Sequence, residues 1–157
     1  MFAVQHKITN MAELQLMVRD ASIQDLPALS DLMNQLGYPT SLAEMGQRFK
    51  AIDNHSDYKT FVVAAANEVI AMAGTVTNYF YEQNGCYVRI VTFVVNGAYR
   101  NKGAGAILLQ HIESRAKEAG ASAVVLNCGN RAERQQAHKF YQNNGYQIKS
   151  SGYFKKL

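Results

Sequence analysis

The chain has few of the residues that build disulfide frameworks and metal centres. Its two cysteines, Cys86 and Cys128, share no ligand-type spacing with each other or with histidine, so we expect reduced thiols and no metal site. No apolar run approaches the length of about 18 residues that a membrane-spanning helix needs. Residues 1–10 contain one lysine, no long apolar stretch and no A-x-A cleavage pattern, unlike a secretory signal. These absences predict a cytoplasmic protein that does not bind a membrane.

Charged residues make up only 18% of the 157 residues and apolar residues make up 48%, a balance typical of a globular chain rather than a disordered one. The net charge of +4 is a mild basic excess. It is consistent with an ordinary solvated surface, or with attraction of an anionic ligand such as a nucleotide cofactor. The basic residues do not gather into one stripe, so the sequence does not predict a nucleic-acid interface.

Apolar periodicity predicts one mixed α/β domain over residues 14–157, with residues 1–13 as a flexible extension. We expect strands at residues 14–19, 60–66, 69–78, 86–95, 123–127, 146–148 and 152–155. Helices are expected at residues 22–36, 41–52, 103–119 and 132–143. Pro27 fits only near the first turn of the first helix, and Gly37 ends that helix. This order of elements favours a central sheet with helices on both faces.

The most informative segment is the turn between the predicted strand 86–95 and the helix that follows it. It carries R-x-x-G-x-G at Arg100, Gly103 and Gly105. Glycines let the backbone approach a ligand closely, and the free N–H groups and dipole of a helix start favour an anion. Neither the third glycine of a dinucleotide-binding motif nor a P-loop is present. The turn therefore predicts a pyrophosphate site, and the alternative is a basic, glycine-rich helix start without a ligand.

The second informative segment is the predicted helix 132–143. Ala137 is small enough for close packing, and Phe140 is expected in the core. The phenol of Tyr141 has an ordinary pKa of about 10, so at neutral pH it holds a proton that it can give to a departing thiolate. The alternative is a buried ring with a satisfied hydroxyl. We expect His138 to be a surface or packed residue, and direct attack by an amine leaves no need for Cys128 as a nucleophile.

These two motifs, R-x-x-G-x-G at residues 100–105 and A-H-K-F-Y-x-x-x-G-Y at residues 137–146, resemble the GNAT family of N-acetyltransferases. The similarity covers residues 16–157 and depends on the order and spacing of the motifs and on the strand before each. It implies a single-domain, mixed and mostly antiparallel central sheet with helices on both faces. It also implies transfer of an acetyl group from acetyl-CoA to the primary amine of a small molecule, by direct attack in a ternary complex.

The resemblance also implies roles for particular residues. The main chain at residues 93–95 would pair with the pantetheine arm of CoA, an amide near Phe93 would polarise the acetyl carbonyl, and Tyr141 would protonate the leaving thiolate. The implied cofactor-binding residues are Val94, Val95, Arg100, Asn101, Lys102, Gly103, Ala104, Gly105, Ala106 and Arg134.

Two positions depart from the family pattern. Many members have asparagine where this chain has Arg134, and many have glutamate at or next to the position of Thr92, whose hydroxyl cannot act as a base at neutral pH. The base is therefore unassigned. The C-terminal segment is similar to that of aminoalkylphosphonate and small-polyamine acetyltransferases. We expect the acceptor, a small polar or anionic amine, to contact Tyr38, Tyr79, Tyr81 and Arg89, unless these are ordinary loop and hairpin residues.

Other functions remain open at this point. The acceptor could be a protein or peptide lysine or an N-terminus, and the fold could instead be a non-catalytic acyl-CoA-binding module. A nucleic-acid-binding domain would require steeply salt-dependent binding, which nothing in the residue spacing demands. Phe93, Val94 and residues 79–81 could also support a homodimer through sheet or hairpin contacts.

Overall fold

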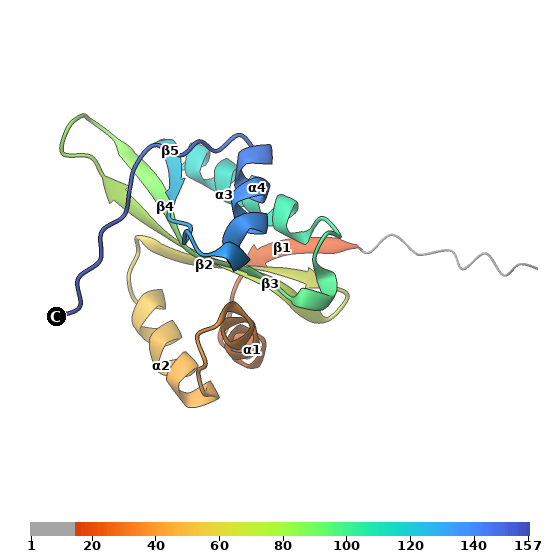
Figure 1. Ribbon diagram of the computed structural model, residues 1–157. Helices are drawn as coiled ribbons and strands as arrows, with labels where there is room; N and C mark the ends of the chain where they lie inside the picture. Colours follow the sequence, from red (N-terminus) through yellow and green to blue (C-terminus); the bar gives the residue numbers. More distant parts are fainter. Residues whose placement is uncertain (1–14) are drawn as a thin grey trace, which may run out of the picture.

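A five-stranded sheet in the order β1-β2-β3-β4-β5 forms the centre of the computed structural model, which describes residues 15–157 (Figure 1). The first four strands pair antiparallel, and β5 pairs parallel with β4. This confirms the mixed, mostly antiparallel sheet, while the expected extension at residues 1–13 lies outside the described residues. The strands are β1 (Leu16–Asp20), β2 (Tyr58–Ala65), β3 (Glu68–Tyr79), β4 (Cys86–Val95) and β5 (Ala121–Leu126).

Helices cover both faces of the sheet, as predicted (Figure 1). One face carries α1 (Leu26–Leu36) and α2 (Leu42–Asp53), and the other carries α3 (Ala104–Glu118) and α4 (Gln135–Asn143). Three short 3-10 turns precede α1, α3 and α4, namely η1 (Ile23–Asp25), η2 (Gly97–Tyr99) and η3 (Ala132–Arg134). Within residues 15–157, no helix is both long enough and apolar enough to cross a bilayer.

The two cores follow from the alternation of side chains along the strands. Val62 of β2 packs with Leu29 and Leu32 of α1, whereas the next residue, Val63, packs with Leu108 of α3. Because both faces are covered, β2 is apolar without interruption over residues 61–65. Full burial of one leucine such as Leu29 stabilises the fold by about 1.5–3 kcal/mol.

Local chemistry explains where the helices near the site begin and end. The predicted first helix is split, because Pro27 lies in the first turn of α1 and the preceding residues form η1. Gly37 ends α1 with a left-handed φ of 99°. The next helix, α2, starts with a capping box in which the Ser41 hydroxyl accepts the N–H of Glu44 at 3.2 Å.

The sheet opens between the ends of β4 and β5. Their pairing ends at Ile90↔Leu126, although β4 continues to Val95. On its other side, β4 has a bulge opposite the step from Gly74 to Thr75. A Cβ on Gly74 would lie only 3.0 Å from the Thr92 methyl carbon, so the bulge needs a glycine there. The result is a stretch of β4 whose outer edge is not covered by β5.

The prediction of two C-terminal strands is wrong. Residues 146–157 have no regular secondary structure, and β5 pairs only with β4 among the described residues. The segment passes β5 at the edge of the domain (Figure 1), and side chains that were expected in strands, such as Ile148 and Phe154, are exposed. An apolar pattern alone does not produce a strand where the main chain finds no ladder partner.

Candidate active site

A pocket of about 340 Å³ lies where β4 and β5 separate. Four segments that are far apart in the sequence form it: the end of α1 with the loop after it, the second half of β4, the end of β5 with the loop after it, and η3 with α4. Its lining residues are Met33, Leu36, Tyr38, Ile90, Val91, Thr92, Phe93, Leu126, Asn127, Cys128, Gly129, Arg131, Arg134, Ala137 and Tyr141. The predicted residues Phe93, Tyr141 and Tyr38 are therefore brought together.

The glycine turn leads from the end of β4 into α3. Asn101 and Gly103 both have left-handed φ values, 59° and 88°, and an added Cβ on Gly103 would meet no atom within 4 Å. The N–H of Ile107 donates to the carbonyl of Gly103 at 3.1 Å, so the N–H groups of residues 104–106 precede the first hydrogen bond within the helix. Such a helix start can bind an anion.

Of the other residues of the turn, some are exposed where a ligand could reach them and one packs against a neighbouring helix. Arg100 and Lys102 are exposed, and the Lys102 ammonium lies 5.3 Å from the centre of the Tyr99 ring. Gly105 also has a packing role, because an added Cβ would lie 3.3 Å from the ring of Phe140. The absence of a side chain at Gly105 lets α3 approach α4, and this accounts for the second glycine without any ligand.

Tyr141 lies in a cluster of aromatic rings beside the pocket. Its ring centre is 6.1 Å from that of Phe93, 5.3 Å from that of Phe140 and 5.8 Å from that of Tyr146. Burial, with a smaller contribution from Cys128, raises the pKa of Tyr141 to about 12, and the charge of Arg134 opposes this shift. The phenol therefore keeps its proton throughout the neutral range.

Tyr146 shows the structural role that a tyrosine can have in the same cluster. Its hydroxyl donates to Oε1 of Glu113 on α3 at 3.0 Å. Burial and the Glu113 carboxylate raise the pKa of Tyr146 well above its ordinary value. Tyr146 does not line the pocket between β4 and β5, whereas Tyr141 does.

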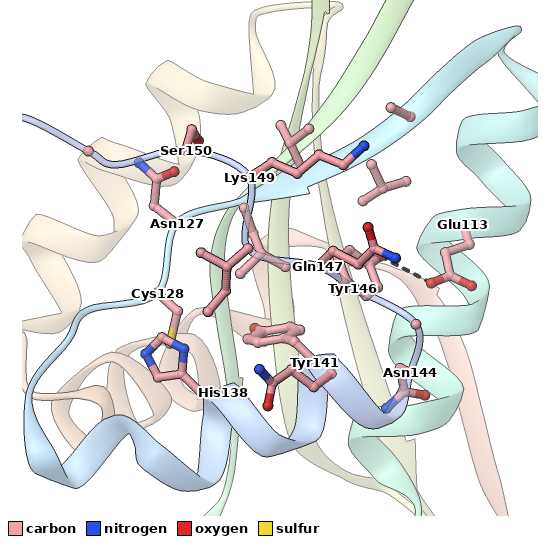
Figure 2. Close-up of a pocket in the computed structure, with 18 of the residues that line it drawn as sticks. Glu113, Asn127, Cys128, His138, Tyr141, Asn144, Tyr146, Gln147, Lys149 and Ser150 are labelled. Atoms are coloured by element: carbon pink, nitrogen blue, oxygen red, sulfur yellow. Dashed lines mark hydrogen bonds between the residues drawn. The ribbon is translucent and has the colours of Figure 1, made fainter.

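Figure 2 shows a second, larger cavity of about 1070 Å³ between β5, α3, α4 and the C-terminal segment. Tyr141 projects from α4 toward it, and Tyr146 and Gln147 lie on the segment that crosses it (Figure 2). Residues 126–129 and Tyr141 line both cavities, so the two are neighbours across the end of β5. The larger cavity reaches the second half of α3 and not its N-terminus, where the glycine turn lies.

Arg134, in the turn η3 before α4, lines the pocket. Its Nη2 donates to the carbonyl of Leu36, at the end of α1, at 3.4 Å, and it lines the pocket together with Tyr38. Arg89 approaches the same region from β4, since its Nη1 donates to Oδ1 of Asn127 at 3.5 Å.

Tyr79 and Tyr81 are not among the residues that line the pocket, and their contact with the acceptor stays a prediction. They are exposed in the hairpin between β3 and β4. Tyr79 pairs with Cys86 at the start of β4, whereas the pocket begins at Ile90, four residues and about 13 Å further along the strand. Val94 is buried, so its side chain cannot form the dimer contact considered from the sequence.

Sequence reasoning missed several lining residues. Met33 and Leu36 were expected only as core positions of a helix, and the Thr92 hydroxyl lies 3.9 Å from Sδ of Met33. Cys128 lines the pocket, but burial raises the pKa of its thiol and so disfavours the nucleophilic thiolate. Nε2–H of His138 donates a hydrogen bond to the Gly129 carbonyl at 2.9 Å and so holds the loop after β5. Among residues 15–157, no three His, Cys, Asp or Glu side chains are grouped as metal ligands.

Comparisons with known proteins agree with this geometry. Residues 26–146, most of the chain, match the Acetyltransferase (GNAT) family. A GNAT family acetyltransferase from Staphylococcus aureus subsp. aureus USA300_TCH1516 shares 34% sequence identity, with a TM-score of 0.79 over 90% of this chain and 98% of that chain. The chain therefore belongs to the GNAT family of acetyl-CoA-dependent acetyltransferases.

Two more distant structures show the same fold. Glucosamine-6-phosphate N-acetyltransferase from Arabidopsis thaliana shares 21% identity, covering 91% of this chain and 99% of that one with a TM-score of 0.76. An aminoglycoside acetyltransferase from an uncultured soil metagenomic sample shares 16% identity, covering 90% and 96% with a TM-score of 0.75. A search of curated proteins found no significant match. The resemblance in Arg100–Gly105 and Ala137–Tyr146 thus identified the correct family.

Proposed function

We propose that this enzyme acetylates the primary amine of a small molecule by direct attack on acetyl-CoA in a ternary complex. The observation that best supports this is the opening of the sheet between β4 and β5. It leaves an unpaired strand edge beside a phenol that holds its proton, and the glycine turn follows at the end of the same strand.

The glycine turn and β4 would bind the cofactor. The N–H groups of residues 101–106 suit the pyrophosphate because they precede the hydrogen bonds of α3. The exposed cations Arg100 and Lys102 add attraction for the phosphates. Val94 is buried and Val95 partly so; both would pair with the pantetheine arm through main-chain groups, which β5 does not cover.

The chemistry needs little beyond positioning and one proton. Acetyl-CoA supplies the acetyl group as a thioester. An amide at Phe93 polarises the carbonyl while the amine forms the new C–N bond. As the C–S bond breaks, Tyr141 donates its hydrogen to the sulfur. The proton lost by the attacking nitrogen returns to the Tyr141 oxygen through water, so that the net products are an amide and a thiol.

Among the described residues, no side chain of the enzyme acts as the base that deprotonates the acceptor amine; water takes that proton, or the amine arrives already neutral. In the part of the chain that the structure describes, no aspartate or glutamate lines the pocket, and Thr92 cannot accept a proton at neutral pH. The amine therefore has to lose its proton to solvent, or reach the pocket in neutral form. This predicts a rate that rises with pH as the acceptor amine deprotonates.

The size of the pocket favours a small acceptor. About 340 Å³ is near the lower end of ligand pockets, and Tyr38 and the end of α1 close one side of it. A protein lysine would need an open groove around its peptide. We place the reaction in the cytoplasm, which agrees with the two free cysteines, Cys86 and Cys128.

Calorimetry with acetyl-CoA, followed by a thiol-release assay over a panel of amines and lysine peptides, tests this proposal. We expect micromolar binding and thiol release with small amines. Release with peptides alone would make the protein a lysine or N-terminal acetyltransferase. Binding without any release would indicate a non-catalytic acyl-CoA-binding module, and absence of binding would contradict the assignment of the glycine turn.

A further inference from the structure

Among the described residues, the charged side chains that line the pocket between β4 and β5 are all positive. Within residues 15–157, its ionisable lining residues include two arginines, Arg131 and Arg134, and no carboxylate. A third guanidinium, that of Arg89, is hydrogen-bonded to the lining residue Asn127. The three cations come from β4, the loop after β5 and the turn before α4, so they approach the pocket from different elements.

Two of these three arginines are not neutralised by acidic partners. Arg131 lies 3.4 Å from Glu133, and both side chains are mostly exposed, so solvent screens that pair. By contrast, the salt bridges formed among the described residues involve neither Arg89 nor Arg134. The hydrogen bond of Arg134 to the Leu36 carbonyl uses one of its five N–H donors, at the long distance of 3.4 Å.

We infer that the acceptor is a small primary amine that also carries an anionic group, and that Arg134 binds this group. The inference rests on the proposed function and specifies its substrate class. Arginine presents a planar pair of donors that matches a carboxylate or phosphate. Arg134 lines the same pocket as Tyr141, so the anion and the amine would be separated by a short spacer.

The same charges discriminate against polycations and assist the reaction. A polyamine would bring several ammonium groups beside guanidinium groups with no carboxylate to compensate them, which disfavours its binding. A positive environment also lowers the pKa of the acceptor amine and so favours its neutral, nucleophilic form. The arginines thereby compensate for the absence of a basic side chain in the pocket.

The matched pair of ethanolamine and phosphoethanolamine tests the inference, because the two differ only by the phosphate. We expect calorimetry on the protein saturated with CoA to show tighter binding of phosphoethanolamine by about 10- to 100-fold, the range of a charge-assisted hydrogen-bonded pair. The preference in kcat/KM with acetyl-CoA should be similar. β-Alanine against its amide repeats the comparison with a carboxylate.

Arg134→Gln should abolish this preference while leaving the KM for acetyl-CoA unchanged, and Arg134→Lys should keep part of it. Arg115→Gln is the matched control, since it removes an exposed arginine that pairs with Glu118 on α3. Thermal melting of each variant separates loss of folding from loss of recognition.

Three results would overturn the inference. The first is equal or weaker binding of the anionic member of each pair. The second is an Arg134→Gln variant that melts at a lower temperature but keeps the preference for the anionic acceptor. The third is an Arg134→Gln variant in which only the KM for acetyl-CoA changes. The last two would assign Arg134 to capping α1 or to the cofactor. The proposed function fails separately, if acetyl-CoA does not bind or no amine in the panel releases thiol.

Discussion

Replacement of Tyr141 by phenylalanine removes one oxygen from the pocket and keeps the aromatic packing. The ring contacts with Phe93, Phe140 and Tyr146 do not involve the hydroxyl, so we expect the free energy of unfolding to change by less than about 1 kcal/mol. A positioned general acid contributes about 10²- to 10⁴-fold to a rate. The variant should therefore lose that factor in kcat, about 3–5 kcal/mol of transition-state stabilisation, with an unchanged Kd for acetyl-CoA.

The pH profile of the wild-type enzyme should carry the same signature. With a pKa of about 12, Tyr141 is ionised in about one molecule in a thousand at pH 9. Because the raised pKa keeps the phenol protonated below that value, any loss of activity due to its ionisation begins only as the pH approaches 12. We therefore expect kcat/KM to rise with the deprotonation of the acceptor amine and then to stay level up to about pH 10.

Tyr146→Phe is the matched control, since it removes a hydroxyl from the same aromatic cluster that is bonded to Glu113 outside the pocket. It should retain kcat and lose only some stability. Thiol-release kinetics and calorimetry with acetyl-CoA on both variants decide whether Tyr141 is the general acid. Full activity of Tyr141→Phe, or a decline of the wild-type profile with a pKa near 8 that disappears in this variant, would refute the assigned role.

Two further substitutions test the fold around the site. Gly103→Ala should destabilise the protein by about 1–2 kcal/mol, because alanine is strained at a φ of 88° even though the space is open, and acetyl-CoA should bind more weakly, as measured by calorimetry. Asp25→Asn should cost about 2 kcal/mol in urea unfolding, because it breaks a pair with Arg19 at 2.7 and 2.8 Å. The hydrogen bond from Arg19 lowers the pKa of Asp25, so its contribution is full above pH 4 and should be lost on acidification through that lowered pKa.

The sequence predicted most elements because their signals are local. The spacing of Leu29 and Leu32, the left-handed Gly37 and the capping box at Ser41 each act within a few residues. The start of the first helix was placed too early because Ser22 also looks like a cap, whereas Pro27 confines the α-helix to residues 26–36. The prediction of two C-terminal strands was wrong because a strand needs a partner strand that is distant in the sequence, and no local pattern reveals that partner.

The candidate site was predictable where one segment carries the signal. The glycine turn and Tyr141 each follow from a short motif, and the comparisons confirm the family that these motifs indicated. Residues that join the pocket from other elements gave no such signal. Met33 looked like any helical core residue, and Tyr79, which was predicted to contact the acceptor, pairs with Cys86 at the end of β4 away from the pocket.

The deviations from regular structure are what create the pocket, and this is why pattern reasoning approaches it only indirectly. A bulge in β4 opposite Gly74, together with the end of pairing at Leu126, separates two strands that would otherwise continue side by side. The β4 main chain beyond Ile90 then has one free edge, and Arg134, in the turn before α4, donates to the Leu36 carbonyl at the end of α1. A sheet with perfect pairing would bury these groups against one another. In this sheet, the second half of β4 has lost its ladder hydrogen bonds to β5. That loss is the structural condition for binding an extended ligand along β4, because the ligand would restore those hydrogen bonds.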